Sequence, residues 1–157
     1  TRPNQVWATD ITYININGKF VYFMAIVDLY SRYIISKELS PSLESSFCVY
    51  TLQEAFKKCV PEIFNTDQGS QFTSNSFINT LEVAGVKISM DHKGRCFDNI
   101  FVERLWRTIK QEAVYFYRPS SLKDLEIVLE EFIDWYNNRR IHQSLDYKRP
   151  VEMYYEN

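Results

Sequence analysis

The first third of the chain has the alternation of polar and apolar residues that is typical of β-strands. Residues 6–16 alternate in this way and are rich in Thr, Ile and Tyr. Asn17-Gly18 follows and predicts a two-residue hairpin turn. Residues 20–27 are mostly apolar, which fits a central strand buried on both faces. With a third strand over 33–39, the pattern predicts a three-stranded meander.

From residue 40 the apolar spacing changes to that of helices. Ser40-Pro41 is typical of an N-cap followed by Pro at the first helical position, and it predicts a helix that runs to about Lys58. Pro61 ends this pattern. The other expected elements are a strand over 62–66, a helix from Ser74 to Ala84 ended by Gly85, a strand over 86–89, a loop over 91–97, a helix from an Asp98 cap to about Val114, and a helix over 122–138.

The predicted order of elements is β-β-β-α-β-α-β-α-α, which indicates an α/β fold. Three antiparallel strands followed by βα units predict a mixed five-stranded sheet with helices on both faces, the order of a ribonuclease H-like domain. The length of 157 residues suits one domain, and we expect 1–157 to form it. The tail over 141–157 contains Pro150 and is expected to be partly irregular. No apolar run is long enough to span a membrane.

The formal net charge of −2 argues weakly against a nucleic-acid partner, but the basic residues are unevenly distributed. They gather in the C-terminal half, where ordinary solvated surface is the alternative interpretation. Two segments hold them, with Lys93, Arg95, Arg104, Arg107, Lys110 and Arg118 in the first and Arg139, Arg140, Lys148 and Arg149 in the second.

The cysteines predict neither a disulfide framework nor a zinc site. They are three in number and widely spaced, at Cys48, Cys59 and Cys96. Only two histidines are present, and none of them forms a metal-binding cluster with these thiols.

Three acids stand in positions that would suit a metal site. Asp10 lies within the first predicted strand, and Asp67 directly follows a short apolar strand. In open α/β sheets, sites lie at the carboxyl ends of strands. Glu103 lies on a predicted helix, on one face with Asn99, Arg107 and Lys110. Taken singly, the three acids are equally compatible with an edge acid, a turn Asp and a solvated Glu–Arg pair.

Taken together, the acids indicate divalent-metal chemistry. Mg²⁺ is usually held by a few carboxylates together with waters and substrate phosphate. Acids from two strands and one helix can hold two ions, which stabilise the attacking and leaving oxygens in phosphoryl transfer. Ligand types alone leave Mg²⁺ and Mn²⁺ as alternatives.

The chain resembles the orfB-type bacterial insertion-sequence transposases, which contain an integrase catalytic core of the retroviral-integrase superfamily. Asp67 and Glu103 are separated by 35 residues, which is the D,D-35-E spacing of that superfamily. Six blocks match the family in order: Trp7-Ala8-Thr9-Asp10-Ile11-Thr12-Tyr13, Val27-Asp28-Leu29-Tyr30-Ser31-Arg32, Thr66-Asp67-Gln68-Gly69-Ser70-Gln71-Phe72, Ser89-Met90-Asp91-His92-Lys93-Gly94, Asp98-Asn99-Ile100-Phe101-Val102-Glu103 and Tyr136-Asn137-Asn138-Arg139-Arg140.

The resemblance implies roles for individual residues. Asp10, Asp67 and Glu103 match the catalytic acids that bind two Mg²⁺ or Mn²⁺ ions. Lys110 matches a basic residue that contacts DNA near the site, and Asn99 matches an Asn beside the acids. Further expected DNA contacts are Lys93 and Arg95 before the catalytic helix and Arg107 on it. At Ile100-Phe101 and Asp91-His92 the chain departs from many relatives, and we draw no conclusion from this.

The resemblance also implies the reaction and its partners. Family members cleave DNA at the ends of a mobile element to free a 3′-OH and then transfer that strand to target DNA. A homo-oligomer is expected, because two ends must be brought together. The resemblance implies neither a membrane partner nor a small-molecule substrate. The location implied is the bacterial cytoplasm, at the nucleoid. Relatives carry an N-terminal segment that binds element ends, and this chain shows none.

Other classes of protein fit the sequence less well. A tyrosine recombinase would need an earlier Arg block than Arg139-Arg140. A ribonuclease H-type nuclease or junction resolvase fits the fold but not the 35-residue spacing. The main alternative is a non-catalytic DNA- or protein-binding remnant of a transposase, which would have lost metal binding.

Overall fold

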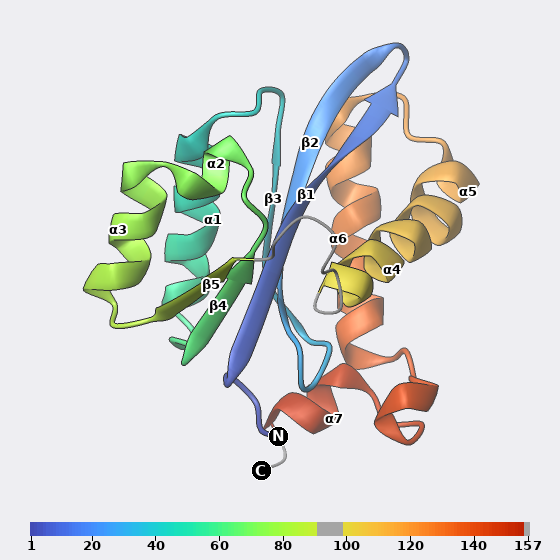
Figure 1. Cartoon of the computed structure of the whole chain (residues 1–157). Coiled ribbons are helices and arrows are strands. Elements are labelled where there is room, and N and C mark those ends of the chain that lie inside the picture. The colour runs from blue at the N-terminus through green and yellow to red at the C-terminus, as the bar shows by residue number, and fades with distance from the viewer. Residues whose placement is uncertain (91–98, 156–157) are drawn as a thin grey trace.

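The five strands of the protein form one mixed sheet, drawn in Figure 1 from the computed structural model, which describes residues 1–90 and 99–155. The strand order is β3-β2-β1-β4-β5. The first three strands pair antiparallel, whereas β4 pairs parallel with β1 and with β5. The strands are β1 (Val6–Ile16), β2 (Lys19–Asp28), β3 (Ile34–Ser40), β4 (Ile63–Thr66) and β5 (Lys87–Met90). The predicted meander and mixed sheet are confirmed.

The hairpin between β1 and β2 forms at the predicted dipeptide. Asn17 and Gly18 both have positive φ, at 50° and 84°, as a type I′ turn requires. The side chain of Asn15 stabilises the turn by accepting a hydrogen bond from the Gly18 N–H at 2.9 Å. The turn sets the register of β1 on β2, in which Asp10 lies opposite Ala25.

Helices cover both faces of the sheet and form two hydrophobic clusters with it (Figure 1). One cluster joins the sheet to α1 and α3, and the other joins it to α4 and α6. Since β1 and β2 contribute side chains to both clusters, they are the central strands of the fold. The helices are α1 (Ser45–Phe56), α2 (Ser70–Thr73), α3 (Asn75–Val83), α4 (Asn99–Ile109), η1 (Lys110–Val114), α5 (Tyr115–Tyr117), α6 (Leu122–Asn138), η2 (Gln143–Leu145) and α7 (Pro150–Tyr155).

The predicted start of the first helix is wrong. Ser40 ends β3 instead of capping α1, and its hydroxyl bonds to the backbone of Ser42. The helix begins at Ser45, with Glu44 in the N-cap position. Pairing of β3 with β2 continues to Ser40, so sheet pairing prevails over the local Ser-Pro signal.

Other helix boundaries follow the local signals more closely. Ser74 caps α3 by accepting a hydrogen bond from the Phe77 N–H, and Gly85 ends that helix with a φ of 78°. The short α2 before it was not predicted. Helix α6 has the predicted bounds. The helix before it contains the π-helical turn η1, which ends at the predicted limit Val114, and it continues beyond that residue as α5. The expected loop over 91–97 and the Asp98 cap lie outside the described residues.

The tail packs back against the start of the chain. It contains the short helices η2 and α7, with irregular segments between them. The Tyr154 ring stacks on Tyr33 at 4.7 Å, and its hydroxyl donates to the Asn4 side chain at 2.8 Å. Over the ranges 1–90 and 99–155, no helix has both the length and the apolar character needed to cross a membrane.

Candidate active site

The first acid, Asp10, lies on β1 just beyond its pairing with β4. The parallel register between these strands joins Val6 to Ile63 and continues only to Ala8 and Asn65. Asp10 is therefore two residues past the last paired position of β1. It is half-buried, and it faces the helical layer formed by α4 and α6, since Ala8 on the same side of the strand belongs to that cluster.

The second acid, Asp67, directly follows β4, at the position that matches Asp10. It is two residues past Asn65, just as Asp10 is two residues past Ala8, so the parallel register brings the two acids side by side. The side-chain Oδ1 of Asp67 accepts a hydrogen bond from the Gly69 N–H at 2.8 Å. This contact ties the carboxylate to the tight turn that follows the strand.

The Asp67 carboxylate affects the protonation of Asp10. The pKa of Asp10 is raised to about 6, mainly by burial and also by the charge and hydrogen bonding of Asp67. Hydrogen bonds from the Ile11 backbone and from Trp106 act in the opposite direction. Two adjacent carboxylates that raise a pKa in this way form a donor set suited to a hard divalent cation, because a bound cation would relieve their repulsion.

The third predicted acid, Glu103, is exposed on α4. Three residues further along this helix, the Trp106 indole N–H donates to Asp10 Oδ2 at 3.4 Å. Helix α4 therefore contacts the Asp10–Asp67 pair within one turn of Glu103. Among the residues that the structure describes, however, no three His, Cys, Asp or Glu side chains are grouped closely enough to hold a metal ion. The structure brings Asp10 and Asp67 together and does not group Glu103 with them.

Trp106 was not identified as a site residue from the sequence. Its ring is buried against Phe23, with 5.5 Å between ring centroids, so it extends the apolar face of α4. A buried indole N–H needs an acceptor, and Asp10 is that acceptor. The signal available in the sequence was a Trp beside the apolar stripe of a helix that also carries a candidate acid.

The basic side chains of this region lie beyond Glu103 along the helix. Arg107 is exposed in the last turn of α4. Lys110 begins the π-helical turn η1, and its Nζ lies 5.5 Å from the centroid of the Tyr13 ring on β1. Single π-helical turns within helices are frequent at functional sites. Lys93 and Arg95, together with the side chain of Asn99, lie outside the described part of the chain.

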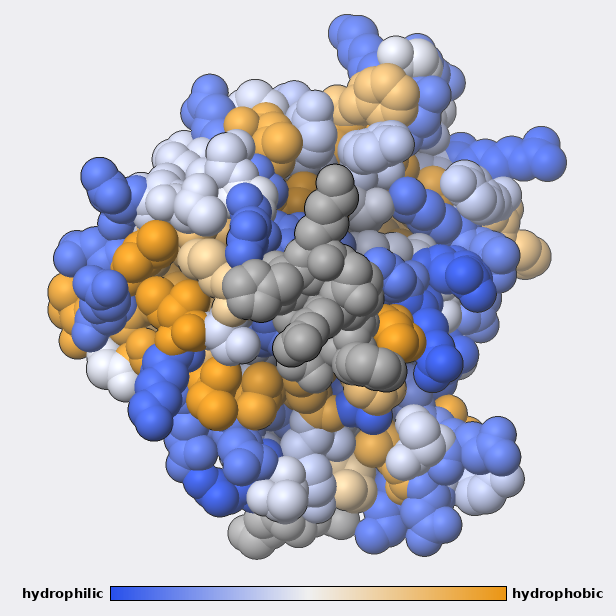
Figure 2. Space-filling model, viewed as in Figure 1, coloured by the Kyte–Doolittle hydropathy of each residue, from blue (hydrophilic) through white to orange (hydrophobic). Residues whose placement is uncertain are grey.

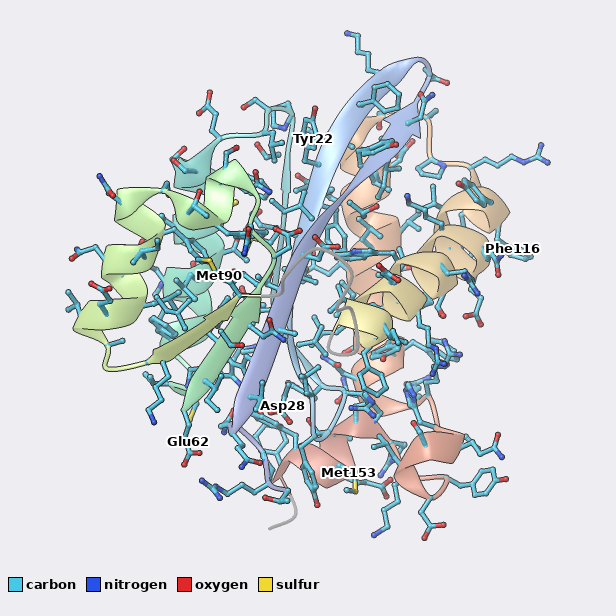
Figure 3. All side chains as sticks on the ribbon, in the orientation of Figure 1. Tyr22, Asp28, Glu62, Met90, Phe116 and Met153 are labelled. Carbon is cyan, nitrogen blue, oxygen red and sulfur yellow. The ribbon has the colours of Figure 1, made fainter. Side chains whose placement is uncertain are left out.

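The surface around these elements differs between the two helical layers. Figure 2 shows hydrophobic side chains gathered on the α3 side of the face that it presents, whereas the α4 side is mostly hydrophilic. Figure 3 shows Phe116 projecting from the far end of the α4–η1–α5 helix, away from the sheet. The polar character of the α4 side suits a charged ligand.

Gly69 is needed for the position of the Asp67 carboxylate. A Cβ at this residue would lie 2.9 Å from Asp67 Oδ1 and 2.6 Å from the side-chain nitrogen of Gln71. The Gln71 side chain is flexible and can move aside, but the added Cβ also requires the Asp67 carboxylate to shift. We expect Gly69→Ala to weaken Mn²⁺ binding about tenfold, with little change in melting temperature, because small displacements in a site have large effects. Calorimetric titration checks this, with Gln71→Ala as the control, and an unchanged affinity in Gly69→Ala would contradict it.

Asp10 should make stability depend on pH. Its pKa is raised from 3.8 to about 6, so its stabilising contribution is complete below about pH 4 and is lost as pH rises through about 6. In EDTA, Asp10→Asn should therefore stabilise the protein near neutral pH by at most roughly 3 kcal/mol. The gain should vanish near pH 4. Urea unfolding across this range measures it, and Glu82→Gln controls for loss of a surface charge. A gain that did not vary with pH would refute the interpretation.

Comparison with known proteins identifies the family. Residues 1–96 match the family model described as integrase core domain, and residues 84–150 match a second model with the same description. The chain belongs to the integrase core domain family, as the sequence motifs predicted.

The relatives are proteins of bacterial insertion sequences. The InsK protein of insertion sequence element IS150 from Escherichia coli (strain K12) is 36% identical over 155 residues, which are 97% of this chain and 55% of that protein. The transposase for IS904 from Lactococcus lactis subsp. lactis (strain IL1403) is 32% identical over 156 residues, which are 97% of this chain and 62% of the relative. The chain thus spans little more than half the length of these relatives.

Solved structures share the fold. The HTLV-2 integrase catalytic core domain in complex with magnesium has a TM-score of 0.81 at 20% identity, with 98% of each chain covered. A chain of the simian T-cell lymphotropic virus intasome, in complex with PP2A regulatory subunit B56 gamma, has a TM-score of 0.86 at 20% identity. That match covers 98% of this chain and 55% of the other. The predicted ribonuclease H-like fold is confirmed.

Proposed function

We propose that this chain is the catalytic core of a transposase that cuts and joins DNA strands by divalent-metal-dependent phosphoryl transfer. The observation that carries the proposal is the parallel register of β1 and β4, which sets Asp10, within β1, beside Asp67, just after β4. Membership of the integrase core domain family supports it. The transposases for the insertion sequence elements IS629 and IS904 are among the relatives of this chain.

In this proposal Asp10, Asp67 and Glu103 together hold Mg²⁺ or Mn²⁺. When bound, two such ions would neutralise charge on the attacking and leaving oxygens of a phosphodiester. Asp10 and Asp67 are already adjacent, and Glu103 would complete the set from α4. Trp106 keeps Asp10 in place through its N–H, and Gly69 does the same for Asp67. Each is a positioning residue for one carboxylate.

The substrate in this proposal is the DNA backbone at the end of a mobile element. Water attacks the phosphorus and breaks its bond to the 3′-oxygen, which leaves a 3′-OH on one strand end and a phosphate on the other. That 3′-OH then attacks a phosphodiester of the target strand and displaces the 3′-oxygen of that strand. Lys110 and Arg107 would hold phosphates beside the acids, and Lys93, Arg95 and Asn99 would add contacts from the segment that leads into α4. Because two ends are joined, we expect a homo-oligomer to act, at the nucleoid in the bacterial cytoplasm.

The test is strand cleavage and transfer on a labelled, branched oligonucleotide with Mg²⁺ or Mn²⁺, compared with EDTA. Metal-dependent products are expected. If no products form, and the chain binds DNA but does not bind metal, the alternative of a non-catalytic remnant is favoured. The exposed aromatic residues Tyr115, Phe116 and Tyr117 on α5 give no reason to prefer that alternative, since they lie outside both the acid pair and the basic face of α4.

A further inference from the structure

Apart from the acid pair, the described part of the chain contains a small cavity with a cationic lining. It has a volume of about 190 Å³ and lies between α4, the C-terminal end of α6 and the turn that joins β2 to β3. Arg32 and Ser144 also line a neighbouring cavity of about 580 Å³. The side chains with polar groups that line the smaller cavity are Arg32, Arg104, Thr108, Tyr136, Arg140, His142 and Ser144.

Arg32 is held rigidly in this cavity. Its backbone has a positive φ of 66°, and its guanidinium donates to the Leu29 carbonyl. The guanidinium lies over the Phe101 ring, 3.3 Å from the ring centroid. Its Nε is buried and has no hydrogen-bond partner within the described residues. An unpaired buried N–H is costly, so this atom indicates a missing acceptor.

His142 presents a second buried nitrogen without a partner. Its Nε2 is buried and makes no hydrogen bond with any residue that the structure describes. The ring packs edge-on against Tyr136, with 5.0 Å between centroids. Burial, and then the charges of Arg140 and Arg32, lower the pKa of His142 to about 4. The imidazole is therefore neutral at physiological pH, and one tautomer offers an N–H donor at Nε2.

The positive charge around the cavity is only partly balanced. Arg140 pairs with Glu112 at 3.0 Å. Asp28, near Arg32, already accepts hydrogen bonds from the Asn4 N–H and from the N–H and hydroxyl of Ser31. Neither acid lines the cavity. Arg104 is exposed and makes no ion pair with any residue in the ranges 1–90 and 99–155, so one cation is left unbalanced there.

We propose that this cavity binds a phosphate group of a DNA strand, outside the site of the catalytic acids. The proposal rests on the proposed function, because Arg104 directly follows Glu103 on α4 and a strand held by the acids would pass this helix. Guanidinium groups match phosphate oxygens with paired N–H donors. Arg32 Nε and His142 Nε2 supply further donors, and the hydroxyls of Thr108 and Ser144 add to them. The site would anchor the backbone of a DNA strand and would not read its sequence.

DNA binding in EDTA tests the proposal without any cleavage. Fluorescence anisotropy on a labelled duplex is compared for the wild type, Arg104→Gln and the control Lys123→Gln, which removes one exposed charge at the start of α6. We expect Arg104→Gln to weaken binding about tenfold and to reduce the slope of log affinity against log salt by about 1. Lys123→Gln should change neither. Equal effects in the two variants would overturn the proposal.

A second measurement observes the cavity directly and distinguishes the source of the phosphate. The Nε–Hε signal of Arg32 is followed by NMR in labelled protein during titration with inorganic phosphate or with the duplex. A shift of the signal on addition of the duplex supports the proposal, whether or not inorganic phosphate also shifts it. A shift with inorganic phosphate but none with the duplex overturns the proposal in favour of a free-anion site. No shift with either titrant overturns it entirely. Because EDTA prevents catalysis, failure of the proposed cleavage activity would leave these outcomes readable.

Discussion

Glu103→Gln is expected to reduce metal-dependent strand cleavage and strand transfer by about 1,000-fold, because loss of one ligand charge removes several kcal/mol of charge stabilisation at the phosphate. Glutamine keeps the size of the side chain and its place on α4. Since Glu103 is exposed, we expect the free energy of unfolding to change by less than about 0.5 kcal/mol. Product formation on the branched oligonucleotide measures the loss.

Glu82→Gln is the matched control for this variant. Glu82 is an exposed acid on α3, on the opposite side of the sheet, and its replacement should leave both products unchanged. If Glu103→Gln cleaved as fast as Glu82→Gln, the assignment of the third acid would be wrong. In that case Asp10 and Asp67 would be the metal-binding pair without help from α4.

Asn137→Ala is expected to have the largest effect on stability. The buried side chain of Asn137 accepts from the Ile34 N–H at 2.8 Å and donates to the Ile34 carbonyl at 3.1 Å. It therefore joins α6 to the edge strand β3. Alanine would leave both backbone groups of Ile34 unpaired in a buried position. We expect a loss of about 3 kcal/mol, and a melting temperature lower by roughly 6–12 °C.

The neighbouring residue provides the control. Within the described residues, the side chain of Asn138 donates hydrogen bonds only inside α6, to the carbonyl and carboxylate of Asp134 at 3.0 Å. Asn138→Ala should cost less than about 1 kcal/mol. Thermal unfolding of both variants measures the difference, and equal melting temperatures would show that the contact with Ile34 is unimportant. Asn137, within the family motif, thus connects helix α6 to the sheet.

Local patterns were sufficient for most elements of the fold. The Asn17-Gly18 turn and the limits of α6 depend on short-range chemistry, namely positive φ at the turn and a Ser121 cap that accepts from the Asp124 N–H. Such signals lie within a few residues of the structure that they specify. The layer order then follows from the sequence of strands and helices.

Boundaries that depend on distant partners were not predictable in this way. Ser40 stays in β3 because β2 pairs with it, and no local pattern shows that pairing. The π-helical turn at Lys110 has no recognisable signal in the sequence. The cavity around Arg32 likewise joins segments more than 100 residues apart, so its unpaired nitrogens become visible only in three dimensions.

The candidate site was partly predictable for the same reason. The sequence places Asp10 within a strand and Asp67 at the end of another, but only the register of β1 on β4 shows that they are adjacent. The donor to Asp10 was missed, because Trp106 reads as part of an apolar helix face until its N–H is seen at 3.4 Å from the carboxylate. Side-chain hydrogen bonds of this kind depend on how α4 packs on the sheet.

Mn²⁺ binding to the 157-residue chain, followed by electron paramagnetic resonance at neutral pH, tests the central claim most directly. This measurement requires no DNA. The wild type and Glu82→Gln should bind the ion, and Asp10→Asn, Asp67→Asn and Glu103→Gln should each lose it. Mn²⁺ binding that is retained in each of the three single variants would contradict a metal centre built from these acids.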